Sequence, residues 1–94
     1  MDSMSMKRMM QQAKAMQKQI HEQLEKFDST KFEYDYKGLI KTTIYGNLKI
    51  EKIEISPDLI DKDDIDTLQE MLTEAISEAN QDLMAERKKI TQIE

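Results

Sequence analysis

The N-terminal third of the chain places apolar residues at helical spacing. Between them stand mainly Gln, Lys and Glu, which favour helices, and no Gly or Pro occurs before the polar segment Asp28-Ser29-Thr30. Apolar positions at i, i+3, i+4 and i+7 form one stripe along a helix. The pattern predicts a helix over about residues 4–27. Its apolar stripe consists of Met6, Met9, Ala13, Met16, Ile20, Leu24 and Phe27.

The middle of the chain changes to a strand pattern. FEYDY (32–36) alternates aromatic and acidic residues, and LIKTTIY (39–45) and LKIEKIEI (48–55) are rich in β-branched residues. Lys37-Gly38 and Gly46-Asn47 fit two-residue turns, the second with glycine first, as a type II′ turn prefers. Pro57 suits the start of a short turn at 57–60. A three-stranded antiparallel sheet follows.

Two-residue turns would fix the register of this sheet. Lys41 then faces Tyr34 on one side and Lys52 on the other, an unfavourable pair of like charges. One face carries Phe32, Tyr34, Tyr36, Leu39, Tyr45, Leu48 and Ile50, and the other carries Ile40, Ile44, Ile53 and Ile55.

Because both faces of that sheet are partly apolar, a second subunit is expected to cover part of it. The predicted interface of this homodimer, joined through the sheets, is Tyr34, Tyr36, Leu39, Tyr45, Leu48 and Ile50. The alternative is that the two terminal helices of one chain enclose the sheet.

A second long helix is predicted at about 64–91. Asp63 or Asp64 would cap its N-terminus. Its apolar positions are Ile65, Leu68, Leu72, Ala75, Ile76, Ala79, Leu83 and Ile90. The chain therefore reads as one α+β domain over residues 1–94.

Composition narrows the class of protein. Of 94 residues, 38% are hydrophobic, 35% are charged and none is cysteine. The core of so short a chain is small and no disulfide can stabilise it, so we expect self-association to bury further apolar surface. The Met-rich start has no continuous apolar run, and no segment reaches the roughly 18 apolar residues of a membrane span. A cytoplasmic protein with no membrane partner is expected.

The sequence offers little for catalysis. His21 is the single histidine, and only two glycines are present, which excludes a glycine-rich phosphate loop. The run beginning at Asp61 lacks the ligands and the glycine of a calcium loop. We expect no enzyme, no metal, no cofactor and no small-molecule substrate.

Charge is unevenly distributed. Residues 1–27 hold five basic and three acidic side chains, whereas residues 58–94 hold four basic and eleven acidic ones. Lys7, Lys14 and Lys18 fall within about 40° of one another around the first helix. Such a row could follow DNA phosphates, and the alternative is an ordinary solvated face. Near the end of the second helix, Arg87-Lys88-Lys89 could complement the helix dipole.

Several segments in order resemble one family. They are MMQQAKAMQKQIHEQLEKF (9–27), GLIKTTIYG (38–46), IEKIEISPDLI (50–60) and DKDDIDTLQEMLTEAISEAN (61–80). The chain is similar to the YbaB/EbfC family of bacterial nucleoid-associated DNA-binding proteins. The resemblance implies a tweezer-shaped dimer whose helices project from joined sheets, and binding of double-stranded DNA by the N- and C-terminal helices.

The expected function is therefore that of a homodimeric, non-enzymatic protein of the cytoplasm and nucleoid. It would contact duplex phosphates with low sequence specificity and organise the nucleoid or modulate transcription. The expected DNA contacts are Lys7, Arg8, Lys14, Lys18, Arg87, Lys88 and Lys89. The alternative is a protein-interaction module similar to prefoldin-like chaperones, whose early methionines would hold client chains.

Overall fold

The structure, a computed structural model, describes residues 3–92. Three strands form one antiparallel sheet in the order β1-β2-β3, flanked in sequence by two long helices. The predicted α+β fold class is confirmed. The elements are α1 (Ser3–Asp28), β1 (Lys31–Tyr36), β2 (Ile40–Tyr45), β3 (Ile50–Ile55), the 3-10 turn η1 (Pro57–Leu59) and α2 (Ile65–Thr91).

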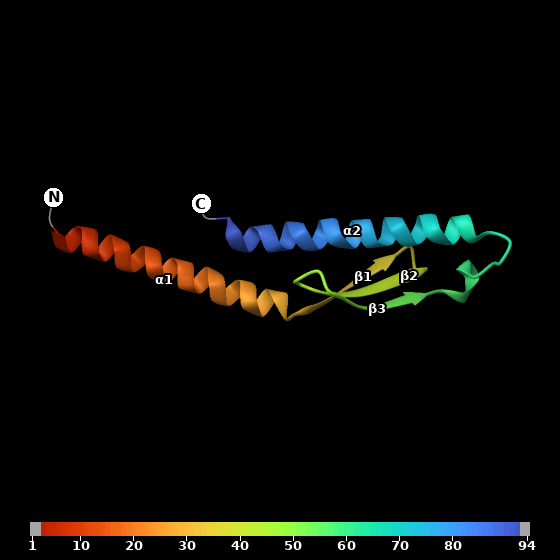
Figure 1. Cartoon of the computed structure of the whole chain (residues 1–94), viewed down its shortest axis with the longest axis horizontal. Coiled ribbons are helices and arrows are strands. Elements are labelled where there is room, and N and C mark those ends of the chain that lie inside the picture. The colour runs from red at the N-terminus through yellow and green to blue at the C-terminus, as the bar shows by residue number, and fades with distance from the viewer. Residues whose placement is uncertain (1–2, 93–94) are drawn as a thin grey trace.

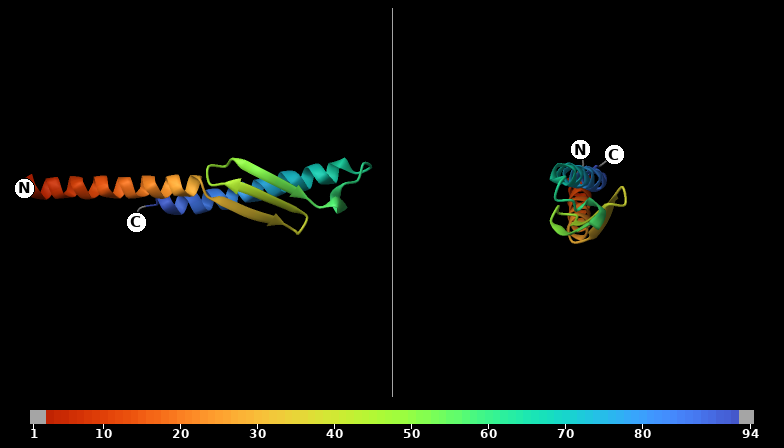
Figure 2. Two further views of the ribbon diagram at one scale, coloured as in Figure 1. Left: turned by 90° about the horizontal axis from the view of Figure 1, so that it is seen from below. Right: turned by 90° about the vertical axis from the view of Figure 1, so that its right-hand side faces the viewer.

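The molecule is a rod of 75 × 19 × 16 Å. Helix α2 covers one face of the sheet, and α1 leads away from the sheet and extends past the end of α2 (Figure 1). Views from below and from the end show the same two-layered body with a projecting helix (Figure 2). The alternative in which both helices enclose the sheet is therefore wrong.

The core lies between β2 and α2. Ile40, Ile44 and Leu83 are fully buried, and Ala75 and Ala79 let α2 approach the sheet closely, because their side chains are small. Tyr36 is also buried, and its hydroxyl donates a hydrogen bond to the Glu74 carboxylate. The apolar positions predicted for both elements thus meet in this single layer.

The predicted register of β1 against β2 is wrong by one residue. Tyr36 pairs with Ile40, because the loop between the strands has three residues, Lys37, Gly38 and Leu39. Lys37 and Gly38 adopt left-handed conformations, with φ values of 54° and 70°. A one-residue slip moves every side chain of a strand to the other face relative to its neighbour. The aromatic residues of β1 therefore share a face with the isoleucines of β2.

The β2–β3 hairpin also differs from the two-residue turn expected. The Leu48 N–H donates to the Tyr45 carbonyl at 2.8 Å, and the Tyr45 N–H donates to the Lys49 carbonyl at 2.9 Å, which leaves a three-residue loop. Its left-handed residue is Leu48, with φ of 74°, not Gly46. Three-residue hairpin loops that end in a left-handed residue are a common connection between antiparallel strands.

A bulge then corrects the pattern of β3. Ile44 pairs with Ile50, whereas Thr43 pairs with Lys52, so Glu51 is an extra residue in the strand. Ile50 and Ile53 are three apart and would otherwise point to opposite faces. With the bulge, both lie on the face toward α2.

The outer face of the sheet is consequently charged, and the premise of two partly apolar faces is wrong. Lys41 lies opposite Glu54, not Lys52. Ion pairs join Lys31 to Glu51 at 2.9 Å and Lys52 to Glu54 at 2.7 Å. These pairs explain how three lysines share one sheet face.

The residues proposed for a sheet-mediated dimer contact differ in accessibility. Tyr36 is only 6% exposed and belongs to the core of its own chain. Tyr34, Leu39 and Tyr45 are half-buried, and Leu48 and Ile50 are exposed.

Helix α2 begins as its sequence predicts. The Asp64 side chain accepts a hydrogen bond from the Thr67 N–H at 3.2 Å, which makes Asp64 rather than Asp63 the N-cap. Within residues 3–92, neither long helix is apolar enough to cross a bilayer.

Leu83→Ala should destabilise the fold strongly, because it removes a fully buried side chain from the α2–sheet layer. We expect a loss of about 3 kcal/mol in the free energy of unfolding. The adjacent Met84 is 58% exposed, so Met84→Ala is the matched control and should cost under about 0.5 kcal/mol. Urea denaturation followed by circular dichroism at one protein concentration would measure both. Equal losses would contradict the assigned core.

Candidate nucleic-acid interface

The candidate interface starts on α1. From residue 3 to residue 19 every side chain of this helix is exposed, and we call this segment the α1 arm. It is the part of the chain that extends farthest from the sheet (Figure 1). Four of the predicted DNA contacts lie on it: Lys7, Arg8, Lys14 and Lys18.

Three of these cations form a line, the basic row of Lys7, Lys14 and Lys18. Helical geometry places them within about 40° of one another and spreads them over about 16 Å of axis. Arg8 points about 100° away from Lys7. Nothing within residues 3–92 pairs with these four cations, so their charges face solvent. The row ends at His21, whose Nε2 lies 2.9 Å from the Glu25 carboxylate.

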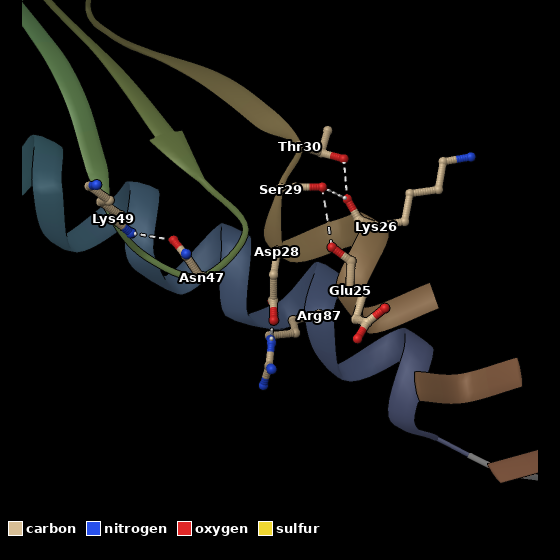
Figure 3. Close-up of polar contacts among 8 residues, drawn as sticks. All are labelled: Glu25, Lys26, Asp28, Ser29, Thr30, Asn47, Lys49 and Arg87. Carbon is tan, nitrogen blue, oxygen red and sulfur yellow. Dashed lines mark hydrogen bonds and ion pairs between the residues drawn. The ribbon is translucent and has the colours of Figure 1, made fainter. Parts of the chain in front are cut away.

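The three predicted contacts at the end of α2 behave differently. Arg87 Nε donates to Asp28 Oδ1 at 3.4 Å, across from α2 to the end of α1 (Figure 3). Lys89 Nζ lies 3.0 Å from Glu86 Oε1. Lys88 borders a shallow hollow of about 350 Å³ together with Met84 and Thr91. Two of these cations are therefore already paired with carboxylates.

The rest of α2 is acidic. Six carboxylates recur at every fourth residue and wind diagonally around the helix, because four residues turn 40° beyond one full circle. We call them the acidic row: Asp66, Glu70, Glu74, Glu78, Asp82 and Glu86. Burial first, and then Asp82 and Glu86, raise the pKa of Tyr34 on the sheet beneath. Positive and negative charge are thus separated between α1 and α2.

Residues 2–93 of the sequence match the profile of the YbaB/EbfC DNA-binding family. The chain belongs to this family. A nucleoid-associated protein of Malacoplasma penetrans is 41% identical over 88 residues, covering 94% of each chain. One from Ureaplasma urealyticum is 36% identical over 93% of this chain and 88% of its own. Another, from Corynebacterium jeikeium, is 38% identical over 94% and 88%.

Membership of the YbaB/EbfC family confirms the resemblance inferred from the ordered segments of sequence. Because this is a DNA-binding family, the charged surfaces of the chain can be compared for their fit to DNA. A solvent-facing basic row on a projecting helix suits phosphate contact, whereas an acidic row repels the duplex. For this family member, the α1 arm is the surface best suited to DNA.

The apolar stripe of α1 is a second feature of the same helix. Met6, Met9 and Met16 are 52%, 63% and 47% exposed, although they lie on the apolar side. Near the base of the helix, Phe27 and Ile90 line a hollow of about 260 Å³ between α1 and α2. The chain alone leaves this stripe uncovered along the α1 arm.

The attachment of α1 to the sheet was not anticipated from the sequence. Gly46 packs directly on the last turn of α1, and a Cβ placed on it would lie 2.6 Å from Phe27 Cδ1 and closer still to the Phe27 carbonyl oxygen. The Gly46 N–H donates to the Thr30 carbonyl at 3.0 Å. In the sequence, Gly46 before Asn47 equally suits a tight turn, so its role in this packing has no separate signal.

The outer face of the sheet is a poor candidate for DNA contact. Its lysines are matched by glutamates, and a hydrogen bond and the charge of Glu51 raise the pKa of Lys31. Lys52 and Glu54 show the reciprocal effect, since their contact raises the pKa of Lys52 and lowers that of Glu54. Duplex phosphates would have to displace these carboxylates.

Proposed function

We propose that this chain is a homodimeric nucleoid-associated protein that binds double-stranded DNA through phosphate contacts from its α1 arm. The observation that carries the proposal is a basic row without carboxylate partners among residues 3–92, on a helix that projects from the body of a YbaB/EbfC family member. Arg8 adds a fourth charge to each arm. Lys88, Lys89 and Arg87 would contribute from the end of α2, with Arg87 and Lys89 shared with carboxylates.

Low sequence specificity is part of the proposal. Lysine ammonium groups on one helical row neutralise phosphates, and such contacts carry no sequence information. The α1 arm has no aromatic residue on which bases of a single strand could stack, which favours duplex DNA. The acidic row would keep DNA away from the α2 side and orient the protein.

The site in the cell follows from the relatives. Proteins of three bacteria that resemble this chain carry the name nucleoid-associated, and we extend that assignment to this one. A dimer with two basic arms would organise the nucleoid or modulate transcription by occupying DNA. The activity proposed is binding without catalysis.

The homodimer is supported by the apolar surface that the single chain leaves uncovered. A 94-residue chain with α1 outside the core buries little, and three methionines of the apolar stripe are about half exposed. We propose that a second copy covers this stripe together with the accessible members of the sheet set. Those members are Tyr34, Leu39, Tyr45, Leu48 and Ile50, whereas Tyr36 supports them from the core.

Reversing charge on the basic row should abolish DNA binding. Lys14→Glu should lower affinity for a mixed-sequence duplex at least tenfold, and Lys14→Glu with Lys18→Glu should remove measurable binding. Lys62→Glu is the control, because it changes net charge equally in the exposed turn before α2, far from the α1 arm. Fluorescence anisotropy on a duplex of about 30 base pairs, at about 50 and 200 mM salt, reads both affinity and salt dependence.

If about eight phosphates are contacted by the dimer, the log–log salt slope should be about −7. Equal losses from Lys62→Glu and Lys14→Glu would show that only net charge matters. No binding by the wild type at the lower salt concentration would contradict the proposed function.

Polar replacements in the apolar stripe should weaken the dimer. Met9→Gln with Met16→Gln is expected to raise the dissociation constant for self-association at least tenfold in analytical ultracentrifugation. Met4→Gln is the control, since Met4 is similarly exposed at 66% but lies about 160° around the helix from Met6, on the opposite side from the stripe. A wild-type chain that is monomeric at micromolar concentration would contradict the dimer. A monomeric chain would instead favour the protein-interaction alternative, in which the exposed methionines bind client chains.

A further inference from the structure

We propose that the junction between α1 and the sheet fixes the direction of the α1 arm, so that Gly46, Asp28 and Arg87 are positioning residues for DNA binding. We call this junction the α1 joint. The inference rests on the proposed function, because it assigns a positioning role in DNA binding to Gly46 and Asp28, and adds that role to the phosphate contact proposed for Arg87. It concerns how the basic rows are held in space.

The first attachment of the α1 joint is the close packing of the β2–β3 loop on the end of α1. Gly46 is buried and sits so near Phe27 that no side chain fits between them. Its N–H bonds to the Thr30 carbonyl, which ties the loop to the residue that follows the helix. The Phe27 ring also contacts the Phe32 ring of β1, with centroids 5.0 Å apart.

The end of α1 is closed by its own side chains. Thr30 Oγ1 donates to the Lys26 carbonyl at 2.6 Å, and Ser29 Oγ donates to the Glu25 carbonyl at 3.2 Å (Figure 3). These bonds satisfy carbonyl groups that a helix C-terminus otherwise leaves without partners. These bonds stabilise the last turn of α1, on which the β2–β3 loop packs.

The second attachment joins α1 to α2. The Arg87–Asp28 ion pair links α2 to the end of α1, and both side chains are partly exposed, at 45% and 35%. An exposed pair adds little stability by itself. Contact with two different elements, however, restricts how the helix can tilt about its end.

Length turns a small tilt into a large displacement. The first residue of α1 lies about 36 Å along the axis from the joint, so a rotation of 10° would move it by about 6 Å. That is nearly twice the 3.4 Å spacing of phosphates along one strand of the DNA axis. The basic rows of two arms can match a duplex only if both joints hold their angle.

The angle can be measured directly, because the chain contains no cysteine. Spin labels on Met10→Cys in the α1 arm and Ser77→Cys on α2 report their separation by pulsed electron resonance. Labelled chains are diluted into unlabelled ones, so that each measured pair lies within one chain. Gly46→Ala is compared with Gly38→Ala, which adds the same methyl group at the opposite end of the sheet, where nothing lies within 4 Å.

We expect a narrow distance distribution in the wild type and in Gly38→Ala, and a displaced or broad one in Gly46→Ala. Duplex affinity should fall at least tenfold for Gly46→Ala. It should stay within twofold for Gly38→Ala, although the positive φ of Gly38 makes that variant less stable. An unmoved arm in Gly46→Ala, or a displaced arm with unchanged affinity, would overturn the proposal.

Asp28→Asn provides a second test that does not depend on Gly46→Ala folding. If Arg87 only contacted phosphate, removal of the neighbouring carboxylate would strengthen DNA binding. Positioning predicts the opposite sign, weaker binding with a broader distance distribution. The exchange Asp28→Arg with Arg87→Asp keeps the net charge and should restore both readouts.

Stronger binding by Asp28→Asn would overturn the positioning role of the Asp28–Arg87 pair. Failure of the proposed function looks different. In that case the wild type binds no duplex, and the distances still report separately whether the joint fixes α1.

Discussion

The arrangement of this protein depends on the contact between Gly46 and the end of α1. The backbone of a hairpin loop approaches the Phe27 carbonyl so closely that only glycine fits. That contact lets α1 leave the sheet as a projecting helix, in line with the long axis of the molecule (Figure 2). Without it, the α1 arm would have no defined direction relative to α2.

Positive and negative side chains are separated between the two helices, which relates the geometry to DNA binding. Within residues 3–92, Lys7, Arg8, Lys14 and Lys18 of the α1 arm have no carboxylate partner, whereas α2 carries the acidic row. The net charge of −5 therefore conceals a basic helix joined to an acidic one. Under the proposed function, electrostatic attraction to a duplex would be local to the arm, and repulsion by α2 would keep the DNA there. Membership of the YbaB/EbfC family is consistent with this division.

The helices and strands could be predicted from the sequence because their periodicities are strong. The register could not, since it depends on loop length, and both hairpin loops are one residue longer than their glycines suggest. The one signal of the bulge in the sequence is the odd separation of Ile50 and Ile53, which does not by itself distinguish a bulge from residues on opposite faces. Because of these register errors, the outer face of the sheet was predicted to be partly apolar. In the structure it is charged, with Lys41 opposite Glu54. The direction of α1 was equally hidden, because periodicity defines a helix but not where it points.

The central claim is that DNA lies along the basic row of α1. Photo-cross-linking tests it most directly, with a benzophenone amino acid placed either at Gln11, beside the basic row, or at Glu78, in the acidic row. Both positions are exposed, so the probe itself should be tolerated equally. The account predicts that illumination in the presence of a duplex yields a protein–DNA adduct from position 11 and none from position 78. An adduct from position 78 but not from position 11 would contradict it.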